Sequence, residues 1–432
     1  MNRTEERFRE RGVWKRLLSV PRNVFSYWSG KAAGWWQSEQ LSQGAQTLII
    51  DRAEVKRLRQ ALSRLETAGT PPRMTAEERL LTEAIREETR RMNRNNVTRT
   101  TAYLRLFERT PELHWAFLAH MVSRNGGWNM TDLKGELVSR LVGESAAEAL
   151  FDFLETSNSY IFHDAYPQLR LFEKSKEHGR SLFHLLPAFG VSSFMRPVWE
   201  QFWRERRPAL LTVGLIVNEQ HYIEKRIVQN ETFKIAVLDT PAFWTHSLLQ
   251  LNAVVFPYAK KESPPKPSGG PEQAGADDYR LAGLVIESFS NLRERIEFGQ
   301  KLYAVLFGVP AVLTQARLFA ARHPHTGSRA DYWPSVFAPV RHTPPQTAYK
   351  EKLDGGKLLP DASPLYSPKL EQAWKDVPLA DPERGDWHRL GASPLRYFET
   401  MRPPLSFEMT NEYEFILNKL ELAVMAGSLL TD

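Results

Sequence analysis

The chain has 432 residues, no cysteine and a formal net charge of +6, with 25% charged and 42% hydrophobic residues. The absence of cysteine excludes a disulfide scaffold, thiolate chemistry and metal sites with cysteine ligands. The ordinary balance of charged and apolar residues excludes a wholly disordered, collagen-like or coiled-coil chain. The length is enough for a sizeable core in one large domain or in two to three smaller ones.

The positive charge is concentrated at the N-terminus. Residues 1–31 contain eight Lys or Arg and three Glu, a net charge of +5, which leaves +1 for residues 32–432. Four of the 12 Trp also lie before residue 37. Cationic side chains with large rings are typical of a surface that binds anionic lipid, although an arm that packs its Trp on the protein is the alternative. The residues predicted to form a membrane or partner surface are Arg7, Arg11, Trp14, Lys15, Arg16, Trp28, Trp35 and Trp36.

The sequence predicts no membrane-spanning helix, because no apolar run reaches the ~18 residues that a span needs. A secretory signal is also excluded, since Gly12, Pro21 and Arg22 interrupt any apolar stretch near the start. Residues 240–259 come nearest to a span, and their polar residues predict a buried helix followed by an extended tail. We therefore expect a cytoplasmic protein that meets a membrane only through its N-terminal surface.

Apolar residues at helical spacing recur along much of the chain. Thr75 and Glu78 form a capping-box pattern, which predicts a helix start because each side chain binds the other residue's free backbone N–H. Pro208 is typical of a first helical position, and the apolar run after it predicts a buried helix. Residues 233–238 are the best strand candidate, and Pro167 is expected to interrupt a helix. The predicted helices are 51–66, 75–93, 97–109, 111–122, 133–142, 145–163, 191–205, 208–217, 281–307, 310–321 and 411–426.

The predicted fold class is mainly α: a multi-helical globular body with a Pro-rich extended segment near the C-terminus. Residues 260–278 are rich in Pro, Gly and Ser without periodicity, and proline recurs at short intervals through 323–404, which favours extended chain wrapped over helices. The predicted parts are a basic aromatic N-terminal arm at 1–40, a helical body at 41–259, a flexible linker or loop at 260–280, and helices plus a Pro-rich wrap at 281–432 that complete the same body.

Residues 120–132 are the first of three polar segments that could carry chemistry. Two adjacent glycines favour a helix stop, and the residues after them favour the cap of a next helix. Free backbone N–H groups at such a start suit a bound anion, with Arg124 supplying charge and Asn125 orienting it. The spacing does not match a P-loop. A purely structural stop and cap is the alternative.

Two further polar segments complete the candidate pocket. In residues 218–224 a His and a Glu three positions apart suit acid–base work or metal binding, and a lone satisfied histidine is the alternative. Residues 325–331 form a polar loop beside aromatic residues, which suits either binding or an ion pair that ties the loop to the helices. The candidate pocket residues are His120, Arg124, Asn125, Trp128, Asp132, Glu219, His221, Glu224, His325, Arg329 and Asp331.

Several common site types find no support in the sequence. There is no Gly-x-Ser-x-Gly turn of a serine hydrolase and no Gly-rich turn of a dinucleotide site, and we predict no cofactor or metal. Residues 86–109 carry seven Arg and three Glu, a net charge of +4, which suits contact with nucleic acid phosphates. A solvated helix face explains the same charges.

Four stretches of this sequence resemble an uncharacterised family of Bacillus-type bacteria, the YppC-like proteins. These stretches are NNVTRTTAYLRLFER at 95–109, HWAFLAHMVSRNGGWNMTDLKG at 114–135, NEQHYIEKR at 218–226 and HTGSRADYW at 325–333. The resemblance covers most of the chain, from roughly residue 90 to roughly residue 425. It implies a bacterial, cytoplasmic and mostly helical protein, and it carries over no activity and no catalytic residue.

The leading hypothesis is a non-enzymatic interaction protein whose basic arm binds an anionic membrane surface or a protein partner. A second hypothesis is an enzyme or ligand-binding protein with a pocket built from residues 120–132, 218–224 and 325–331. A third is a nucleic-acid-binding protein that uses residues 86–109. The sequence specifies no substrate and no oligomeric state.

Overall fold

The structure is a computed structural model. It describes residues 20–66, 74–240, 252–259, 279–377, 380–383, 385–388 and 394–430. For residues 20–29, 66, 259 and 428–430 it describes the backbone alone. Most of the described chain is helical and its strands are short, which confirms the predicted mainly α class.

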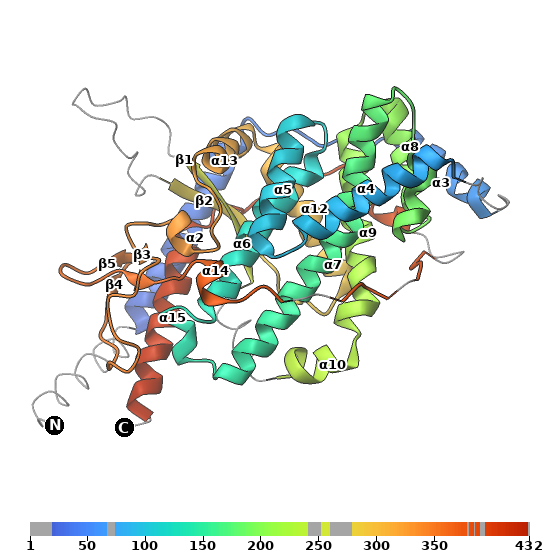
Figure 1. The fold of residues 1–432 in the computed structure, drawn as a ribbon. Helices are drawn as coiled ribbons and strands as arrows, with labels where there is room; N and C mark the ends of the chain where they lie inside the picture. The colour runs from blue at the N-terminus through green and yellow to red at the C-terminus, as the bar shows by residue number, and fades with distance from the viewer. Residues whose placement is uncertain are drawn as a thin grey trace, which may run out of the picture.

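Helices follow one another with few interruptions through the first part of the chain (Figure 1). The α-helices are α2 Val20–Ser42, α3 Arg52–Glu66, α4 Ala76–Met92, α5 Asn96–Arg109, α6 His114–Asp132, α7 Glu144–Glu177, α8 Met195–Glu205, α9 Pro208–Ile223, α10 Glu231–Phe233, α12 Leu292–Gly308, α13 Pro310–Arg322, α14 Leu370–Ala373 and α15 Thr410–Leu430. The short 3-10 helices are η1 Val138–Arg140, η2 Phe183–Phe189, η6 Arg329–Asp331 and η7 Pro394–Tyr397. Two π-helical segments, η3 Glu224–Val228 and η4 Lys234–Leu238, follow α9.

The local signals for helix starts are confirmed where a side chain supplies the cap. Thr75 Oγ1 accepts a hydrogen bond from the Glu78 N–H at 3.2 Å, and Glu78 Oε2 accepts one from the Thr75 N–H at 2.9 Å. Asn95 caps α5 in the same reciprocal way with Thr98. Pro208 occupies the first turn of α9, where its missing N–H costs nothing.

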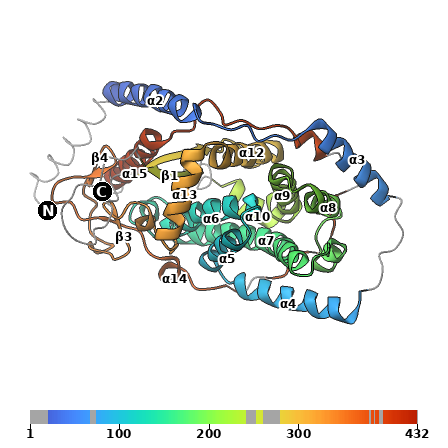
Figure 2. The same ribbon diagram turned by 90° about the horizontal axis from the view of Figure 1, so that it is seen from above.

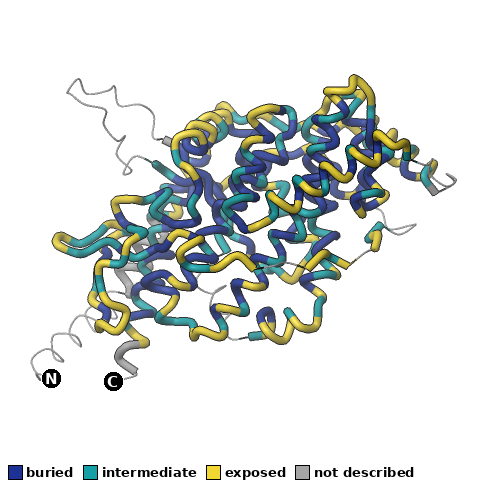
Figure 3. Tube along the Cα trace, viewed as in Figure 1, coloured by how far each residue is buried: buried dark blue, intermediate teal, exposed yellow. Residues whose placement is uncertain are grey.

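Helix α6 occupies the centre of the body. It packs against α5, α7, α9, α12 and strand β1 (Ala253–Ala259). Figure 2 shows α2 and α3 along one flank and α4 along the opposite flank, with α6 and α7 between them. Trp115, Met121 and Trp128 on α6 are each at most 2% exposed. Buried residues accordingly fill the middle of the body in Figure 3, and exposed residues follow its outline.

A two-stranded antiparallel hairpin crosses the body beside α6. Strand β1 pairs with β2 (Tyr279–Val285), with Val255 opposite Gly283. A Cβ at Gly283 would lie 2.0 Å from the Val254 carbonyl oxygen, so only glycine fits there. On the other edge, Asn125 of α6 accepts a hydrogen bond from the Val255 N–H and donates one to its carbonyl. The predicted linker at 260–278, which joins these strands, lies outside the described residues.

The predicted helix stop at Gly126 and Gly127 is wrong. Helix α6 continues through both glycines to Asp132, so no new helix starts at 129–131. The second glycine serves close packing: a Cβ on Gly127 would lie 2.6 Å from both Asn96 Oδ1 and His325 Nε2. The free backbone N–H groups on which the predicted anion site depended are therefore absent from this part of the structure.

Two other helix predictions need correction. Pro167 lies inside α7, which continues from Glu144 to Glu177. An interior proline costs a helix ~3 kcal/mol. Fully buried neighbours such as Phe162, Leu169 and Phe172 keep α7 intact through their packing. Residues 133–142, predicted as a helix, form turns and the single 3-10 turn η1, and α6 begins at His114 after a turn that contains Pro111.

The prediction of a strand at 233–238 is also wrong, because these residues form the end of α10 and the π-helical η4. In a strand, Ile235 and Val237 would share one face. Here Val237 and Leu238 are buried while Ile235 is 72% exposed, which suits a helical turn. The Asn230 side chain caps the segment by accepting from the Thr232 N–H at 3.0 Å. Conversely, the helix expected from residue 281 is replaced at its start by strand β2, and α12 begins only at Leu292 after its cap Asn291.

The Pro-rich segment after α13 lies over the helical body as predicted from its composition. It contains four strands of two residues each, of which β3 (Phe337–Ala338) pairs with β6 (Leu365–Tyr366) in parallel and β4 (Leu353–Asp354) pairs with β5 (Lys357–Leu358) in antiparallel. Helix α14 is its one-turn helix. The last helix, α15, packs against α2, so the two ends of the described chain lie side by side (Figure 1).

Among the described residues, no single helix is both long and apolar enough to cross a membrane. Helices α12 and α13 meet that test only as a pair, and the pair is bent by 89°. Residues 241–251, which belong to the predicted buried helix at 240–259, lie outside the described part, and the predicted extended tail corresponds to β1.

Candidate functional site

A cavity of about 660 Å³ lies where α5, α6, α7, α9 and α12 meet the start of β1. Exposed Lys234, Asp239 and Glu287 stand at its mouth, whereas Tyr103 and Trp115 at its inner end are 3% and 2% exposed. Residues 241–251, between two lining positions of the chain, lie outside the described residues. Sites that hold small organic molecules typically measure about 300–1,000 Å³, so this cavity has the size of a ligand site.

Most of the cavity wall is apolar. Five helices contribute aromatic or branched aliphatic side chains from the faces that they turn toward one another. Tyr103 and Trp115 meet edge to face, with ring centroids 5.5 Å apart. The principal apolar lining residues are Tyr103, Trp115, Leu118, Val122, Phe153, Ile161, Ile216, Ile223, Phe289, Phe298 and Leu302.

Arg99 contributes a buried positive charge to the wall. Its side chain is 1% exposed, and its Nη2 lies 2.5 Å from Oε2 of Glu155, which is also buried. Its Nη1 donates to Asn93 Oδ1 at 3.2 Å. Burying a charge is costly unless it is paired, and this pair meets that need. Within the described structure, Arg99 Nε and the Tyr103 hydroxyl are buried without a hydrogen-bond partner.

Glu219 is a carboxylate that borders the cavity from the last turns of α9. Gln220 Nε2 donates to Glu219 Oε1 at 2.7 Å, and Gln220 Oε1 accepts from Arg295 Nε at 2.9 Å. This second bond fixes the orientation of the Gln220 amide, so that its NH₂ group faces the carboxylate. Burial raises the pKa of Glu219 to about 7, although hydrogen bonds from Gln220 and Trp115 act in the opposite direction.

Arg295 and Glu224 form a second charge pair beside the cavity. Arg295 Nη2 binds Glu224, and its Nη1 donates to the Phe289 carbonyl oxygen at 2.6 Å. Glu224 begins the π-helical segment η3, and the other π-helical segment, η4, also supplies wall residues. Such bulges open the backbone hydrogen-bond ladder and occur frequently at functional sites.

The structure separates the predicted pocket residues into several places. Only Asn125, Glu219 and Glu224 line the cavity. Asn125 is held in place by its bonds to Val255 and by its donation to the Met121 carbonyl oxygen. His221, two residues from Glu219, lies on another side of α9, where its Nδ1 contacts the Val217 carbonyl and its ring stacks on Trp387 at 4.3 Å.

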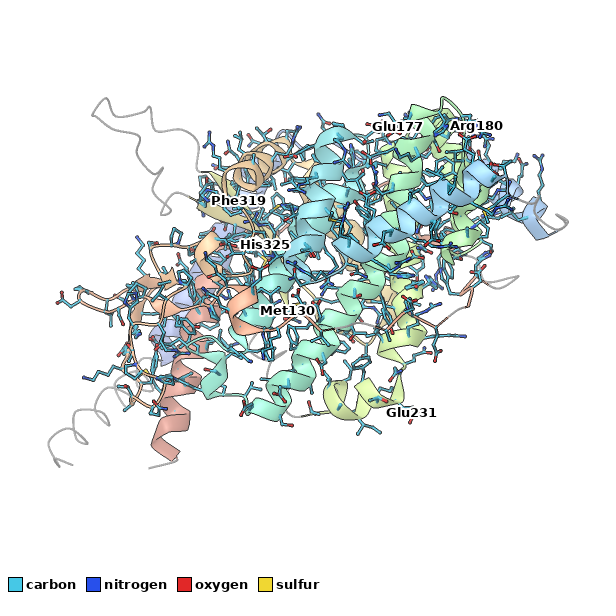
Figure 4. All side chains as sticks on the ribbon, in the orientation of Figure 1. Met130, Glu177, Arg180, Glu231, Phe319 and His325 are labelled. Carbon is cyan, nitrogen blue, oxygen red and sulfur yellow. The ribbon has the colours of Figure 1, made fainter. Side chains whose placement is uncertain are left out.

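A second group, His120, Arg124, His325 and Asp331, lies buried on the other side of α6. His120 Nδ1 is 2.8 Å from the Thr100 carbonyl oxygen, and Arg124 lies over the ring of Phe319 at 4.9 Å. Figure 4 labels His325 and Phe319 near each other beside α6. Burial lowers the pKa of His120 to about 3 and that of His325 well below its ordinary value, so both rings are neutral at physiological pH.

A third group joins the loop at 325–331 to the end of α6. Arg329 Nε and Nη2 each lie 2.6 Å from Asp132 Oδ2, and Arg329 Nη1 donates to the Tyr413 hydroxyl. Its guanidinium lies 5.2 Å from the centre of the Trp128 ring. The hollow beside these residues measures about 10 Å³, roughly the space of one water molecule. This arrangement corresponds to the structural alternative, in which the ion pair ties the loop to the helices.

Sequence patterns alone did not identify the residues that give the cavity its polar and aromatic groups. Arg99 was counted only in the Arg-rich segment, and Tyr103, Trp115 and Arg295 were counted only as helix residues. One signal was present: Arg99 shares the apolar face of α5 with Tyr103 and Leu106 at helical spacing. A charged residue on an otherwise buried face requires a buried partner, but Glu155 is too far along the chain to be recognised as that partner.

The structure describes the Arg-rich segment 86–109 fully and the predicted N-terminal surface only in part. In 86–109, five of the seven Arg form ion pairs, for example Arg99 with Glu155 and Arg109 with Glu173. These pairs neutralise much of the charge that nucleic acid would meet. At the N-terminal surface, Trp35 and Trp36 are 50% and 56% exposed on α2. The side chain of Trp28, and Arg7, Arg11, Trp14, Lys15 and Arg16 entirely, lie outside the described residues.

In the described ranges, no group of three or more His, Asp or Glu is placed to hold a metal ion. The structure defines a class of protein in geometric terms: a helical body with a mainly apolar cavity, bordered by two Arg–Glu pairs and, away from its mouth, by the carboxylate of Glu219.

Residues 91–421 match a family described as a protein of unknown function, DUF2515, and the chain belongs to this family. The chain is also 38% identical over 283 residues to the uncharacterized protein YppC of Bacillus subtilis strain 168. The aligned part covers 65% of this chain and 82% of that relative, which confirms the predicted resemblance. No solved structure matches the chain. All residues that line the cavity fall within the matched range.

Proposed function

We propose that this protein binds a small, mainly apolar molecule in the cavity between α5, α6, α7, α9 and α12. One observation carries the proposal: about 660 Å³ of space beside a mainly apolar wall, whereas the hollow beside Arg329 measures only about 10 Å³. Filling such a space with an apolar ligand removes apolar surface from water at ~25 cal/mol per Å². The few polar groups of the wall then set the orientation of the ligand.

The cavity can be tested with N-phenyl-1-naphthylamine, a neutral probe that fluoresces when it leaves water. We expect saturable fluorescence with the full-length protein. Ala119→Trp would fill the cavity, because Ala119 lies in its wall, and should abolish this binding. Ala311→Trp, at an exposed position of α13, is the matched control and should bind the probe normally.

Val122→Phe adds a smaller group to the same wall, and it replaces Ala119→Trp in this test if that variant lowers the amount of folded protein. A folded cavity-filling variant that binds the probe as tightly as the unmodified protein would overturn the proposal. So would an unmodified protein that gives no saturable signal.

A second candidate function is docking on an anionic lipid surface through α2. The half-exposed rings of Trp35 and Trp36 favour it, together with the net charge of +5 in residues 1–31. Gly34 and Ser38 pack on the chain at 407–408, so the two Trp occupy the outer face of the helix. Rings of this kind bind at headgroup depth while Lys and Arg bind lipid phosphate.

Co-sedimentation with vesicles tests this second candidate. The full chain should sediment with phosphatidylglycerol vesicles and much less with phosphatidylcholine vesicles, because the charge term requires anionic lipid. The double variant Trp35→Ser/Trp36→Ser should lose most of this binding. The single variant Ile235→Ser, at an exposed apolar residue of η4 outside α2, is the control. Equal sedimentation of all three proteins would refute docking through α2.

A further inference from the structure

The chemical class of the ligand follows from which charges inside the cavity have partners. Arg99 pairs with Glu155, and Arg295 pairs with Glu224, so each buried guanidinium is already neutralised by a carboxylate. Among the described residues, Glu219 forms no ion pair with a Lys or Arg. Its carboxylate faces the cavity, and the donors that it receives from the described residues, Gln220 and Trp115, are neutral.

The surroundings of Glu219 suit a cation. The Tyr103 hydroxyl is buried in the cavity wall and has no hydrogen-bond partner in the described ranges, and its oxygen can accept from an N–H group. The rings of Tyr103 and Trp115 stand next to each other in the same wall. Aromatic rings attract a desolvated cation through their electron-rich faces. A carboxylate, a free hydroxyl oxygen and aromatic rings are together the groups that recognise an ammonium ion.

We propose, on the basis of the ligand-binding function above, that the cavity takes an amphipathic amine, whose ammonium group pairs with Glu219 and whose apolar body lies against Ile216, Phe298 and Leu302. The ammonium group would form the ion pair that Glu219 lacks among the described residues. An apolar carboxylate would meet an unpaired negative charge in a desolvated site, which costs free energy.

The pH dependence of binding follows from the same geometry. The pKa of Glu219 is raised to about 7 by burial, and Asp164 of α7 raises it further while Arg295 of α12 lowers it. Tyr103 of α5 also faces Glu219, and burial keeps its pKa well above the ordinary value, so it stays neutral. An ammonium ligand pairs with the ionised form of Glu219, so amine binding should strengthen as pH rises from about 6 to about 8.

Three eight-carbon probes of one shape separate the possibilities: octylammonium, octanol and octanoate. Each is measured by displacement of N-phenyl-1-naphthylamine from the full-length protein. We expect octylammonium to bind at least about tenfold more tightly than octanol, equivalent to about 1.4 kcal/mol, and octanoate to bind most weakly. Glu219→Gln keeps the size and the polar contacts of the side chain, and it should abolish the preference for the amine. Glu148→Gln, at an exposed carboxylate of α7 outside the cavity wall, is the matched control and should keep it.

The outcomes distinguish the two proposals. If octanol or octanoate binds as tightly as octylammonium, or if Glu219→Gln keeps the amine preference, the ligand class is wrong while the cavity remains a binding site. If Ala119→Trp leaves probe binding unchanged, the cavity proposal itself fails. Persistent binding of N-phenyl-1-naphthylamine by Glu219→Gln shows that this variant is folded, so a lost preference cannot be attributed to unfolding.

Discussion

Two sides of helix α6 differ in the space that lies beside their buried polar groups. On one side, Gly126 and Asn125 border a cavity of about 660 Å³. On the other side, Gly127 is pressed against Asn96 and His325, and further along the helix Asp132 binds Arg329 beside a hollow of about 10 Å³. Both sides contain a buried Arg–carboxylate pair, so the charges alone do not mark a site. Both sides also bury polar atoms that lack a partner among the described residues, for example Arg124 Nε on the packed side and Arg99 Nε on the open side. The difference is therefore the space beside these atoms.

This contrast assigns different roles to similar residues. The packed side stabilises the protein, because its ion pair joins the loop at 325–331 to α6 and to Tyr413 of α15. The open side leaves Arg99 Nε and the Tyr103 hydroxyl without partners in the described structure. The following substitutions test the contrast, beginning with the largest expected effect.

The largest effect is expected for Arg329→Met on the packed side. The substitution leaves Asp132 buried without its partner, which costs about 3–5 kcal/mol of unfolding free energy. Urea denaturation measures the loss. The double variant Arg329→Met/Asp132→Leu removes both charges and should recover much of it. A loss below about 1 kcal/mol in the single variant would show that the pair does not hold the loop.

Gly127→Ala should destabilise the protein by about 1–3 kcal/mol, because its new Cβ would lie 2.6 Å from Asn96 Oδ1 and from His325 Nε2. The change would also disturb the 2.8 Å contact between those two residues. Thermal unfolding measures the effect. An unchanged or raised melting temperature would mean that Asn96 and His325 can move to accommodate the methyl group, so that this side of α6 is not closely packed.

Gly126→Ala is the matched control at the next residue and should have the opposite sign. Its Cβ would lie 3.8 Å from the nearest atoms, those of Asn158 and Asn96, which is ordinary contact. Alanine in place of an interior helical glycine then stabilises by about 0.5–1 kcal/mol. The same melting experiment checks it, and a loss of stability would show that the cavity side is as crowded as the packed side.

At pH 4.5 the smallest effect on stability is expected for Glu219→Gln, because the Glu219 carboxyl is protonated there and a neutral amide of similar size replaces it. Burial raises its pKa from 4.5 to about 7, so between these pH values the folded protein holds a proton that the unfolded chain has released. Glu219 therefore lowers the free energy of unfolding as pH rises through this window. The variant should gain stability relative to the unmodified protein from pH 4.5 to pH 8, as measured by melting temperatures. A difference between the two proteins that does not change with pH would contradict the burial of Glu219.

Local sequence patterns predicted much of the fold because their causes are local. The capping box at Thr75 and Glu78 and the first-turn proline at 208 act within one helical turn, and both helix starts are where these residues predict them. The composition of 323–404 likewise predicted extended chain over the body. The failures have distant causes. Gly127 resembles a helix stop, but its partner His325 is almost 200 positions away.

The sequence by itself determined the helical class, most helix starts and the family to which the chain belongs. The first two depend on helix caps and apolar periodicity, which involve residues only a few positions apart. It also placed Asn125, Glu219 and Glu224 among the polar candidates. Only the tertiary structure decided which of these candidates share a cavity, since that depends on how α5, α6, α7, α9 and α12 pack. The pairing of Arg99 with Glu155 and of Arg295 with Glu224 joins separate helical segments, and it leaves Glu219, beside the same cavity, without a cationic partner among the described residues.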